Sequence, residues 1–547
     1  MVRRWPGCAL SLLWILVGCG GSSTTNAGSA GDSGVQAGAG GTGAADAGQV
    51  DGSAGTGGGN AGTGGSAGTG GVDAGKSPSL AGTEFWAVDL PNERGMQPVW
   101  DKRWAVVLHN VGSTTATISV EQNDAAPGAA PSLSTVKALT LAPDEVQNVV
   151  MPTREVTGQT ASTAEPPGPP MTELSSNAFR ITSDEPLLAY QQNPWSDASS
   201  NDGTPLRPTA RLGTGYRVLG LPTANPVAIG PAIPGIPDHS SVTIVGVKPG
   251  TTVKVTAGAD LLGNTASGIA ATSAGGTLTM TLGPFDTLNL SSTGSPGDLT
   301  GTLVEASQRV AVFSSGERVL APFSTFSPAL PTRPGYDPTA LCCTEHFEMA
   351  LPPVDAAGGA FVVPKSPLRS SGGYVEPDLV RVVATQDGTQ VTTSLPAPMN
   401  HFTLQAGEAH DAWSTKSFTV SSSGPVLVAE ILVSHAFTTK DIGDPSVSLI
   451  PDVSNERRAY AYVAPPAYSS SYVVLVSPHG NTLTLDGVAL PSGCTTASIG
   501  QLASTSYDRT QCQVSAGAHH VIGTQPFALF AYGYSPSGSY AIALPGN

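Results

Sequence analysis

A four-fold internal repeat constrains the fold of this chain more than any other feature of its sequence. Four ten-residue windows share one pattern, in which an alternating segment, a short polar stretch and a more apolar segment follow one another: Ile181–Tyr190, Val304–Phe313, Val420–Ala429 and Val521–Phe530. The sixth place in these windows is held by Pro186, Arg309, Pro425 and Pro526. Proline fixes φ and has no N–H, so it suits the first residue of a strand that follows a turn. Each window is therefore predicted to be a β-hairpin, and four in the same order indicate tandem modules.

Two more elements precede each window, always in the same order. The first is a strand, a turn with glycine in the seventh place and a Thr/Val-rich strand, with copies at Val106–Ile118 (Gly112), Ile244–Thr256 (Gly250), Val382–Ser394 (Gly388) and Val474–Asp486 (Gly480). A tight hairpin turn needs φ > 0, which glycine adopts readily. The second is a turn signal between two short strands, at Leu141–Glu145, Leu282–Asp286, Leu404–Glu408 and Val514–Ala518. The three elements together predict at least six strands in each copy.

The composition supports an all-β fold. The chain has 66 Gly and 46 Pro, which are the two worst residues for helix interiors, and this content argues against a helical protein. Short strands with regular turn signals favour four tandem antiparallel β-modules of sandwich-like type. A β-propeller, which also repeats four-stranded units, is the alternative, but copies of roughly 100–125 residues are long for single blades. We place the modules at residues 82–210, 211–325, 326–440 and 441–547.

The first residues form a targeting segment. Arg3 and Arg4 precede the apolar run Ala9–Val17, which is too short to cross a bilayer because a spanning helix needs about twenty residues. The following Leu16-Val17-Gly18-Cys19 resembles the bacterial lipobox. This resemblance implies that residues 1–18 are removed and that Cys19 carries acyl chains, which anchor durably when there is more than one. An ordinary signal peptide is the alternative. We expect a lipid-anchored protein of the bacterial cell envelope, in the outer membrane and exposed at the surface.

Residues 19–81 form the predicted linker. From Gly20 to Ser79 the chain is mostly Gly, Ala, Ser and Thr and contains no aromatic residue. Such a segment buries too little apolar surface to offset its chain entropy, so we expect a disordered tether.

The formal net charge of −16 limits the possible partners. Nucleic acid is excluded because the chain has no basic stripe to meet phosphates. Acidic modules favour calcium or basic partners through long-range attraction, which salt would weaken.

Four cysteines lie beyond the leader and the lipidation site: Cys342, Cys343, Cys494 and Cys512. Disulfides are the rule outside the cytoplasm, and four cysteines allow three pairings. We predict a bridge between Cys494 and Cys512, which flank a Ser/Thr-rich loop. Cys342 and Cys343 would then form a vicinal disulfide or each cross-link elsewhere.

No metal site is marked clearly. Zinc at Cys342-Cys343-x-x-His346 would require a wider cysteine spacing and a second ligand pair. His519-His520 places two imidazoles on opposite faces of a strand, which suits no single metal.

The turn after the first window offers weak candidates for ligand binding. Asp197, Asn201 and Asp202 could bind calcium, but their spacing is not that of an EF-hand loop, and a polar turn capped by Asx side chains is the alternative. Trp195, in Q-N-P-W-S-D, is a candidate for ligand contact at a loop tip, with core packing as the alternative. We therefore predict no cofactor and leave calcium open.

No enzyme motif is present. The chain lacks a Walker loop, H-E-x-x-H and a G-x-G-x-x-G between strand and helix. The carboxylate pairs Asp184-Glu185 and Glu345/Glu348 could flank a glycosidic bond, and His410-Asp411 has no nucleophile placed by sequence; solvated turn residues are the plain interpretation. We predict that the protein is not an enzyme.

Three segments resemble the N-terminal domain of IgG-Fc-binding proteins: Phe179–Pro194 with Ser200-Asn201-Asp202 behind it, Asp298–Glu317 and Cys342–Val354. The likeness covers roughly residues 82–547. Gly203-Thr204-Pro205 departs from the small aliphatic stretch expected after Ser-Asn-Asp. The resemblance implies adhesion to, or binding of, an extracellular protein or glycan, without implying that immunoglobulin is the ligand. A glycan hydrolase and an envelope spacer without ligand are the alternatives.

Overall fold

The computed structural model describes residues 80–92, 103–158, 171–195, 198–224, 238–294, 296–333, 335, 344–440, 442–536 and 538–546. The predicted leader, Cys19 and the linker up to Ser79 lie outside the described residues, as do Asp197, Cys342 and Cys343. Residues 75–547 form one compact unit. Within the described ranges the fold is nearly all β with no α-helix, and no helix there is long and apolar enough to cross a membrane.

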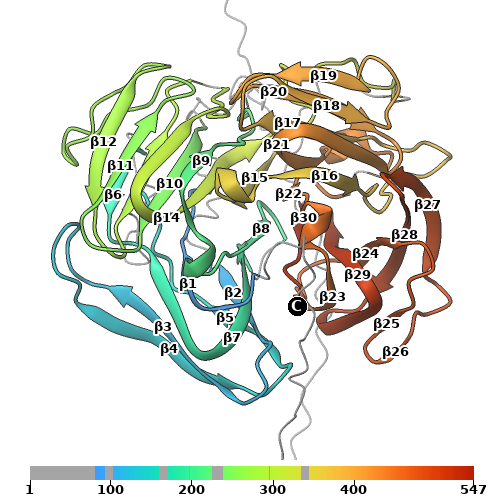
Figure 1. Cartoon of the computed structure of the whole chain (residues 1–547), viewed down its shortest axis with the longest axis horizontal. Helices are drawn as coiled ribbons and strands as arrows, with labels where there is room; N and C mark the ends of the chain where they lie inside the picture. The colour runs from blue at the N-terminus through green and yellow to red at the C-terminus, as the bar shows by residue number, and fades with distance from the viewer. Residues whose placement is uncertain are drawn as a thin grey trace, which may run out of the picture. The chain divides into compact units, whose positions relative to one another are not determined.

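Four antiparallel sheets, one for each module, follow one another along the chain (Figure 1). Module 1 contains β1 (Gly82–Ala87), β2 (Ala105–Asn110), β3 (Ala116–Asn123), β4 (Leu133–Leu141), β5 (Val146–Val150), β7 (Phe179–Asn193) and β8 (Asp202–Pro205). Module 2 contains β9 (Gly213–Arg217), β10 (Ser240–Gly246), β11 (Thr251–Thr256), β12 (Thr277–Leu282), β13 (Thr287–Ser291), β14 (Leu303–Val319) and β15 (Glu345–Ala350). Its sheet also receives β6 (Glu173–Ser175), a strand that lies between β5 and β7 in the sequence.

Modules 3 and 4 follow the same plan. Module 3 contains β16 (Gly358–Val363), β17 (Asp378–Ala384), β18 (Thr389–Thr393), β19 (His401–Leu404), β20 (Ala409–Ser414), β21 (Phe418–Leu432) and β22 (Val447–Leu449). Module 4 contains β23 (Arg457–Ala464), β24 (Ser470–Pro478), β25 (Leu483–Leu485), β26 (Val488–Ala489), β27 (Thr495–Leu502), β28 (Thr505–Val514), β29 (Gly517–Ser535) and β30 (Gly538–Ala543). Single 3-10 turns occur at Thr209–Arg211, Val354–Ala356, His435–Phe437 and Val453–Asn455. The prediction of four antiparallel β-modules is confirmed, although sheets 2 and 3 continue to Ala350 and Leu449, past the boundaries placed at 325 and 440.

The predicted proline hairpins are wrong, because each window is the middle of one long strand. Phe179–Asn193 is a single strand of 15 residues, and β14, β21 and β29 contain the other three windows. The polar stretch is a bend at which the register of pairing shifts, and Pro186 lies there without needing an N–H partner. A bulge and a turn use similar residues, which explains the error.

The predicted glycine hairpins are bends as well. Leu187 pairs with Gly82 of β1 and with Asn110 of β2, so these two strands lie on opposite sides of β7. Arg180 pairs with β1 and with β3 in the same way, which places β2 and β3 on one side of β7 as two parts of one bent ribbon. The glycine φ is +68° at Gly250, +67° at Gly388 and +81° at Gly480, and a positive φ is absent only from the first copy.

The three repeated elements therefore meet at one crease in each sheet. In module 1 the Val111 N–H donates to the Pro186 carbonyl over 3.0 Å, and the Asn110 N–H donates to the Glu145 carbonyl over 3.0 Å. Each of the four antiparallel sheets is curled at this crease.

The modules also close into a ring, as the propeller alternative required. Four buried apolar clusters join modules 1 and 2, 2 and 3, 3 and 4, and 4 and 1. Each cluster contains side chains from both of its modules, for example Leu108 and Phe313, Ile244 and Ile431, Val382 and Phe530, and Leu529 and Val107, in that order. The innermost strands continue the ring, since β8 contacts β15 and β30, and β22 contacts the same two strands. The strands nearest the centre of the ring therefore bury apolar side chains against both neighbouring modules, and this burial holds the four modules together.

Candidate functional site

The centre of the ring is held by a buried aspartate. Asp202 begins β8 and is fully buried. Its carboxylate accepts hydrogen bonds from the Ser446 hydroxyl over 2.8 Å, the Glu348 N–H over 3.2 Å and the Val447 N–H over 3.4 Å. One side chain of module 1 thus links modules 2 and 3.

The segments that resemble the IgG-Fc-binding domain meet at this point. Gln191 of β7 donates to the Glu348 carboxyl of β15 over 3.1 Å. The Asn201 N–H donates to the Glu345 carboxylate, and Gln192 donates to the Asn201 side chain over 3.0 Å. We call Gln191, Asn201, Asp202, Glu345, His346 and Glu348, all fully buried, the polar centre. The likeness in these segments therefore reflects residues that assemble the ring.

Burial sets the protonation of the polar centre. It raises the pKa of Glu348 to about 8 and the pKa of Asp202 well above its usual value, and it lowers the pKa of His346 to about 4. Near neutral pH Glu348 and His346 are therefore mostly uncharged, so hydrogen bonds rather than an ion pair between these two side chains hold them in the centre. Carboxyls enclosed in this way cannot reach a glycosidic bond in a substrate.

The structure places the other predicted residues as follows. Trp195 is only 7% exposed and packs in the cluster between modules 4 and 1, which is the core-packing alternative. Asn201 and Asp202 are buried capping and linking residues, so calcium binding by this turn stays a prediction. The bridge between Cys494 and Cys512 is confirmed, with Cα atoms 4.4 Å apart.

The remaining carboxylates have structural partners. The Thr117 N–H donates to Asp184 and the Thr114 hydroxyl donates to Glu185, each over 2.6 Å, so this pair caps the crease of module 1. Asp411 pairs with the Arg381 guanidinium over 2.8 Å, while the ring of its neighbour His410 stacks on Phe402.

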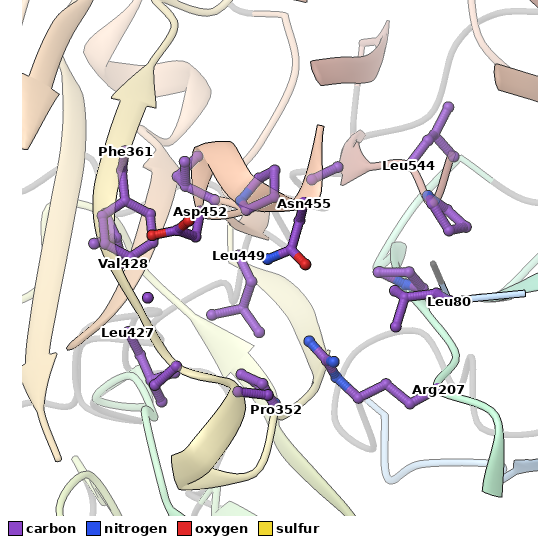
Figure 2. A pocket seen from close by; sticks show the side chains of 18 of the residues that line it. Leu80, Arg207, Pro352, Phe361, Leu427, Val428, Leu449, Asp452, Asn455 and Leu544 are labelled. Carbon is purple, nitrogen blue, oxygen red and sulfur yellow. The ribbon is translucent and has the colours of Figure 1, made fainter. Parts of the chain in front are cut away.

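All four modules line one pocket (Figure 2). Its volume is about 90 Å³, enough for one side chain of a partner rather than for a large ligand. We define this four-module pocket by Leu80, Arg207, Pro352, Phe361, Leu449, Asp452, Asn455 and Leu544. Most of these side chains are apolar, so the few polar groups decide what the pocket accepts.

Arg207 is the unsatisfied polar group of the four-module pocket. It follows β8 by two residues, and its guanidinium points into the space below Asn455 and Leu449 (Figure 2). Among the described residues its side chain makes no hydrogen bond or ion pair, and burial lowers its pKa to about 10. A cation in such surroundings is stabilised by an anionic or amide partner.

Asp452, the carboxylate of the pocket, accepts from backbone N–H groups and does not pair with Arg207. Asp452 accepts from the Gly359 N–H over 2.8 Å, from the Ala360 N–H over 2.9 Å and from the Ser454 N–H over 2.8 Å. The guanidinium therefore remains available to a ligand. No local sequence pattern marks Arg207, because the pocket forms only when segments from four modules meet.

Comparison with known proteins supports one family. The profile described as IgGFc binding protein matches residues 202–533, which is more than half of the chain. Neither the curated proteins nor the solved structures contain a match. The matched region begins at the buried Asp202 and ends in β29, so it includes β8 and β15 of the polar centre and most residues of the four-module pocket, while Gln191 and Asn201 precede it. The chain belongs to the IgGFc-binding protein family.

Proposed function

We propose that this protein is a non-enzymatic binding protein that captures an extracellular protein through the four-module pocket. The observation that carries the proposal is the guanidinium of Arg207, which lies in an apolar pocket without a partner among the described residues. A carboxylate of the partner would pair with it through charge-assisted hydrogen bonds, while neighbouring apolar groups of the partner cover Leu80 and Leu544.

The family to which the chain belongs is described as binding a protein, IgG Fc, and this supports a protein ligand over a glycan. The pocket supports it as well, because its small volume and apolar lining suit one inserted side chain. A sugar ring would need several polar partners around it, whereas most of the lining is apolar and Asp452 is already engaged by backbone N–H groups.

We also propose that the protein acts at the cell envelope, anchored through acyl chains on Cys19 and extended on the linker of residues 19–81. The lipobox resemblance and the Gly-rich composition support this part. A tether of this kind would hold the pocket away from the membrane and let it meet a soluble or surface-bound protein.

The alternatives are less well supported. A glycan hydrolase needs two carboxyls at a reachable bond, but Glu345 and Glu348 are fully buried in the polar centre. A spacer without ligand gives no reason for an arginine without a counter-charge in an apolar pocket, which costs stability.

The binding experiment compares two arginine variants of the full chain in detergent. Arg207→Gln removes the cation from the pocket, and Arg211→Gln removes an exposed arginine four residues further on. IgG Fc is the first probe because the family description names it, and a panel of extracellular proteins follows. We expect Arg207→Gln to weaken binding at least about tenfold and Arg211→Gln to leave it unchanged.

Two results would count against the proposal. Equal binding by both variants would remove the four-module pocket from the interface. If the wild type bound no protein of the panel but bound glycans on an array, the ligand would be a glycan rather than a protein.

A further inference from the structure

Two histidines and an aspartate meet where module 4 closes on module 1. His109 lies on β2 and is nearly buried, Asp144 lies in the turn between β4 and β5, and His520 lies on β29. His109 Nε2 is 2.9 Å from Asp144 Oδ1, and His520 Nδ1 is 3.5 Å from Asp144 Oδ2. One donor atom from each residue lies within 4.8 Å of the other two. Imidazole nitrogen and carboxylate oxygen are common ligands of divalent transition metals.

The junction between modules 4 and 1 carries different side chains from the junction between modules 1 and 2. Asp144 is the fourth residue of its turn and has φ +62°, as Phe285 in module 2 has φ +71°. Phe285 packs against Trp86 of module 1, with ring centroids 4.9 Å apart, and Arg180 of module 1 lies 5.3 Å from its centroid. The fourth turn residue therefore contacts the preceding module at both junctions, through an aromatic ring in one case and a carboxylate in the other.

His520 occupies the place of Arg180. Each lies six residues before the proline of its window, and each meets the fourth turn residue of the next module in the ring. Where module 1 meets module 2, a cation covers an aromatic ring. Where module 4 meets module 1, the same positions hold an imidazole and a carboxylate, and His109 supplies a second imidazole from β2.

The neighbouring histidine does not compete for a metal. His519 Nδ1 is 2.9 Å from Asp486 Oδ2, and its Nε2 is 2.8 Å from the Ser515 carbonyl, so both ring nitrogens are engaged. The sequence predicts that His519 and His520 lie on opposite faces of a strand and therefore do not bind the same metal ion. That reasoning holds for the pair, but the missing ligands of His520 come from module 1.

We propose that His109, Asp144 and His520 bind one divalent transition metal ion, which ties module 4 to module 1. Ligand atoms around a tetrahedral zinc ion are about 3.3 Å apart for bonds of about 2.0–2.1 Å, so the set must contract slightly. Asp144 and His520 can supply this movement because their side chains are 73% and 31% exposed. Water completes the coordination.

Zinc and cobalt titrations of the full chain in detergent test this proposal. After treatment with a chelator, we expect calorimetry to find one Zn²⁺ per chain and Co²⁺ to give the absorption bands of a nitrogen- and oxygen-ligated site. Zinc should also raise the melting temperature, because it binds only the closed ring.

Three variants separate the site from other histidines. Asp144→Asn keeps a residue that tolerates positive φ, and His520→Gln changes a partly exposed side chain; each should weaken Zn²⁺ binding at least about tenfold. His479→Gln is the matched control, because His479 pairs with Asp508 over 2.7 Å without a second histidine, and it should bind as the wild type does. Circular dichroism confirms that the variants are folded.

Wild-type protein that binds no Zn²⁺ below about 10 µM would overturn the site. So would Asp144→Asn or His520→Gln protein that binds as tightly as the wild type. Binding without any rise in melting temperature would overturn the link between the modules. None of these outcomes depends on the four-module pocket, so the two proposals stand or fall separately.

Discussion

The Ser446 hydroxyl donates a 2.8 Å hydrogen bond to the Asp202 carboxylate across a sequence separation of 244 residues. Two N–H groups from modules 2 and 3 complete the set around Asp202. Non-local bonds of this kind decide which modules are neighbours, because the apolar faces of similar modules resemble one another.

Replacing Asp202 should therefore destabilise the whole ring. Asp202→Ala leaves three buried donors without an acceptor, and at about 1 kcal/mol each the free energy of unfolding should fall by about 3 kcal/mol. Ser446→Ala removes one of these bonds and should cost about 1 kcal/mol. Urea denaturation measures both, with Ser324→Ala on an exposed loop as the control. Losses below about 0.5 kcal/mol in both variants would show that the centre does not hold the ring.

Glu348 makes stability depend on pH. Its pKa is about 8 in the folded protein against 4.5 when unfolded, so the folded state holds the proton more tightly and stability falls as the pH rises between these values. His346, lowered from 6.5 to about 4, acts in the opposite direction below pH 6.5, because there the unfolded state binds the extra proton. From pH 6.5 to 8 only the loss from Glu348 remains of the two, about 2 kcal/mol.

Denaturation of the Glu348→Gln variant at pH 6.5 and pH 8 checks this sign. The variant should lose about 2 kcal/mol less than the wild type over the interval. Glu305→Gln, which alters an exposed ion pair with Lys254, should follow the wild type. Parallel behaviour of Glu348→Gln and wild type would contradict the raised pKa.

The disulfide should stabilise module 4. Cys494 and Cys512 are separated by 18 residues, and closing a loop of that size contributes about 3 kcal/mol on the chain-entropy account. A double substitution to serine should lower the free energy of unfolding by that amount and make it insensitive to reductant. Mass spectrometry under non-reducing conditions should find the bridge in the wild type, and a free thiol at either position would refute it.

Lipidation at Cys19 predicts a specific response to globomycin. This inhibitor blocks the peptidase that acts on lipid-modified precursors, so an unprocessed form of the chain should accumulate. Cys19→Ser should abolish both the membrane association and that accumulation, whereas Cys8→Ser should change neither. Normal processing in the presence of the inhibitor would indicate an ordinary signal peptide.

The sequence predicted the number of modules, their strand content and the disulfide, because these depend on local patterns. It misread the windows around Pro186 as hairpins, since a bulge in a long strand and a turn between two strands require the same kinds of residue. A bulge in one strand is distinguished from a turn between two strands by the pairing partners, such as Gly82 and Asn110 on the two sides of Leu187. Those partners cannot be predicted from the local sequence.

The site was less predictable than the fold. The sequence marks Asn201 and Asp202 as candidates for ligand binding, and the structure places both, fully buried, in the polar centre. His109 and His520 are 411 residues apart (520 minus 109), and Leu80 and Leu544 of the pocket that contains Arg207 are 464 apart (544 minus 80), so only the closed ring brings these side chains together.

The contact of module 4 with module 1 fixes the number of repeats. In an open array, a duplication or deletion of one unit leaves the remaining interfaces intact, and such proteins change length freely in evolution. Here every module packs against two neighbours in a closed ring. The loss of one module would expose the apolar faces of both neighbours, and an additional module could not be inserted without opening an interface. We therefore expect relatives of this chain to diversify through loops and side chains at the rim rather than through repeat count.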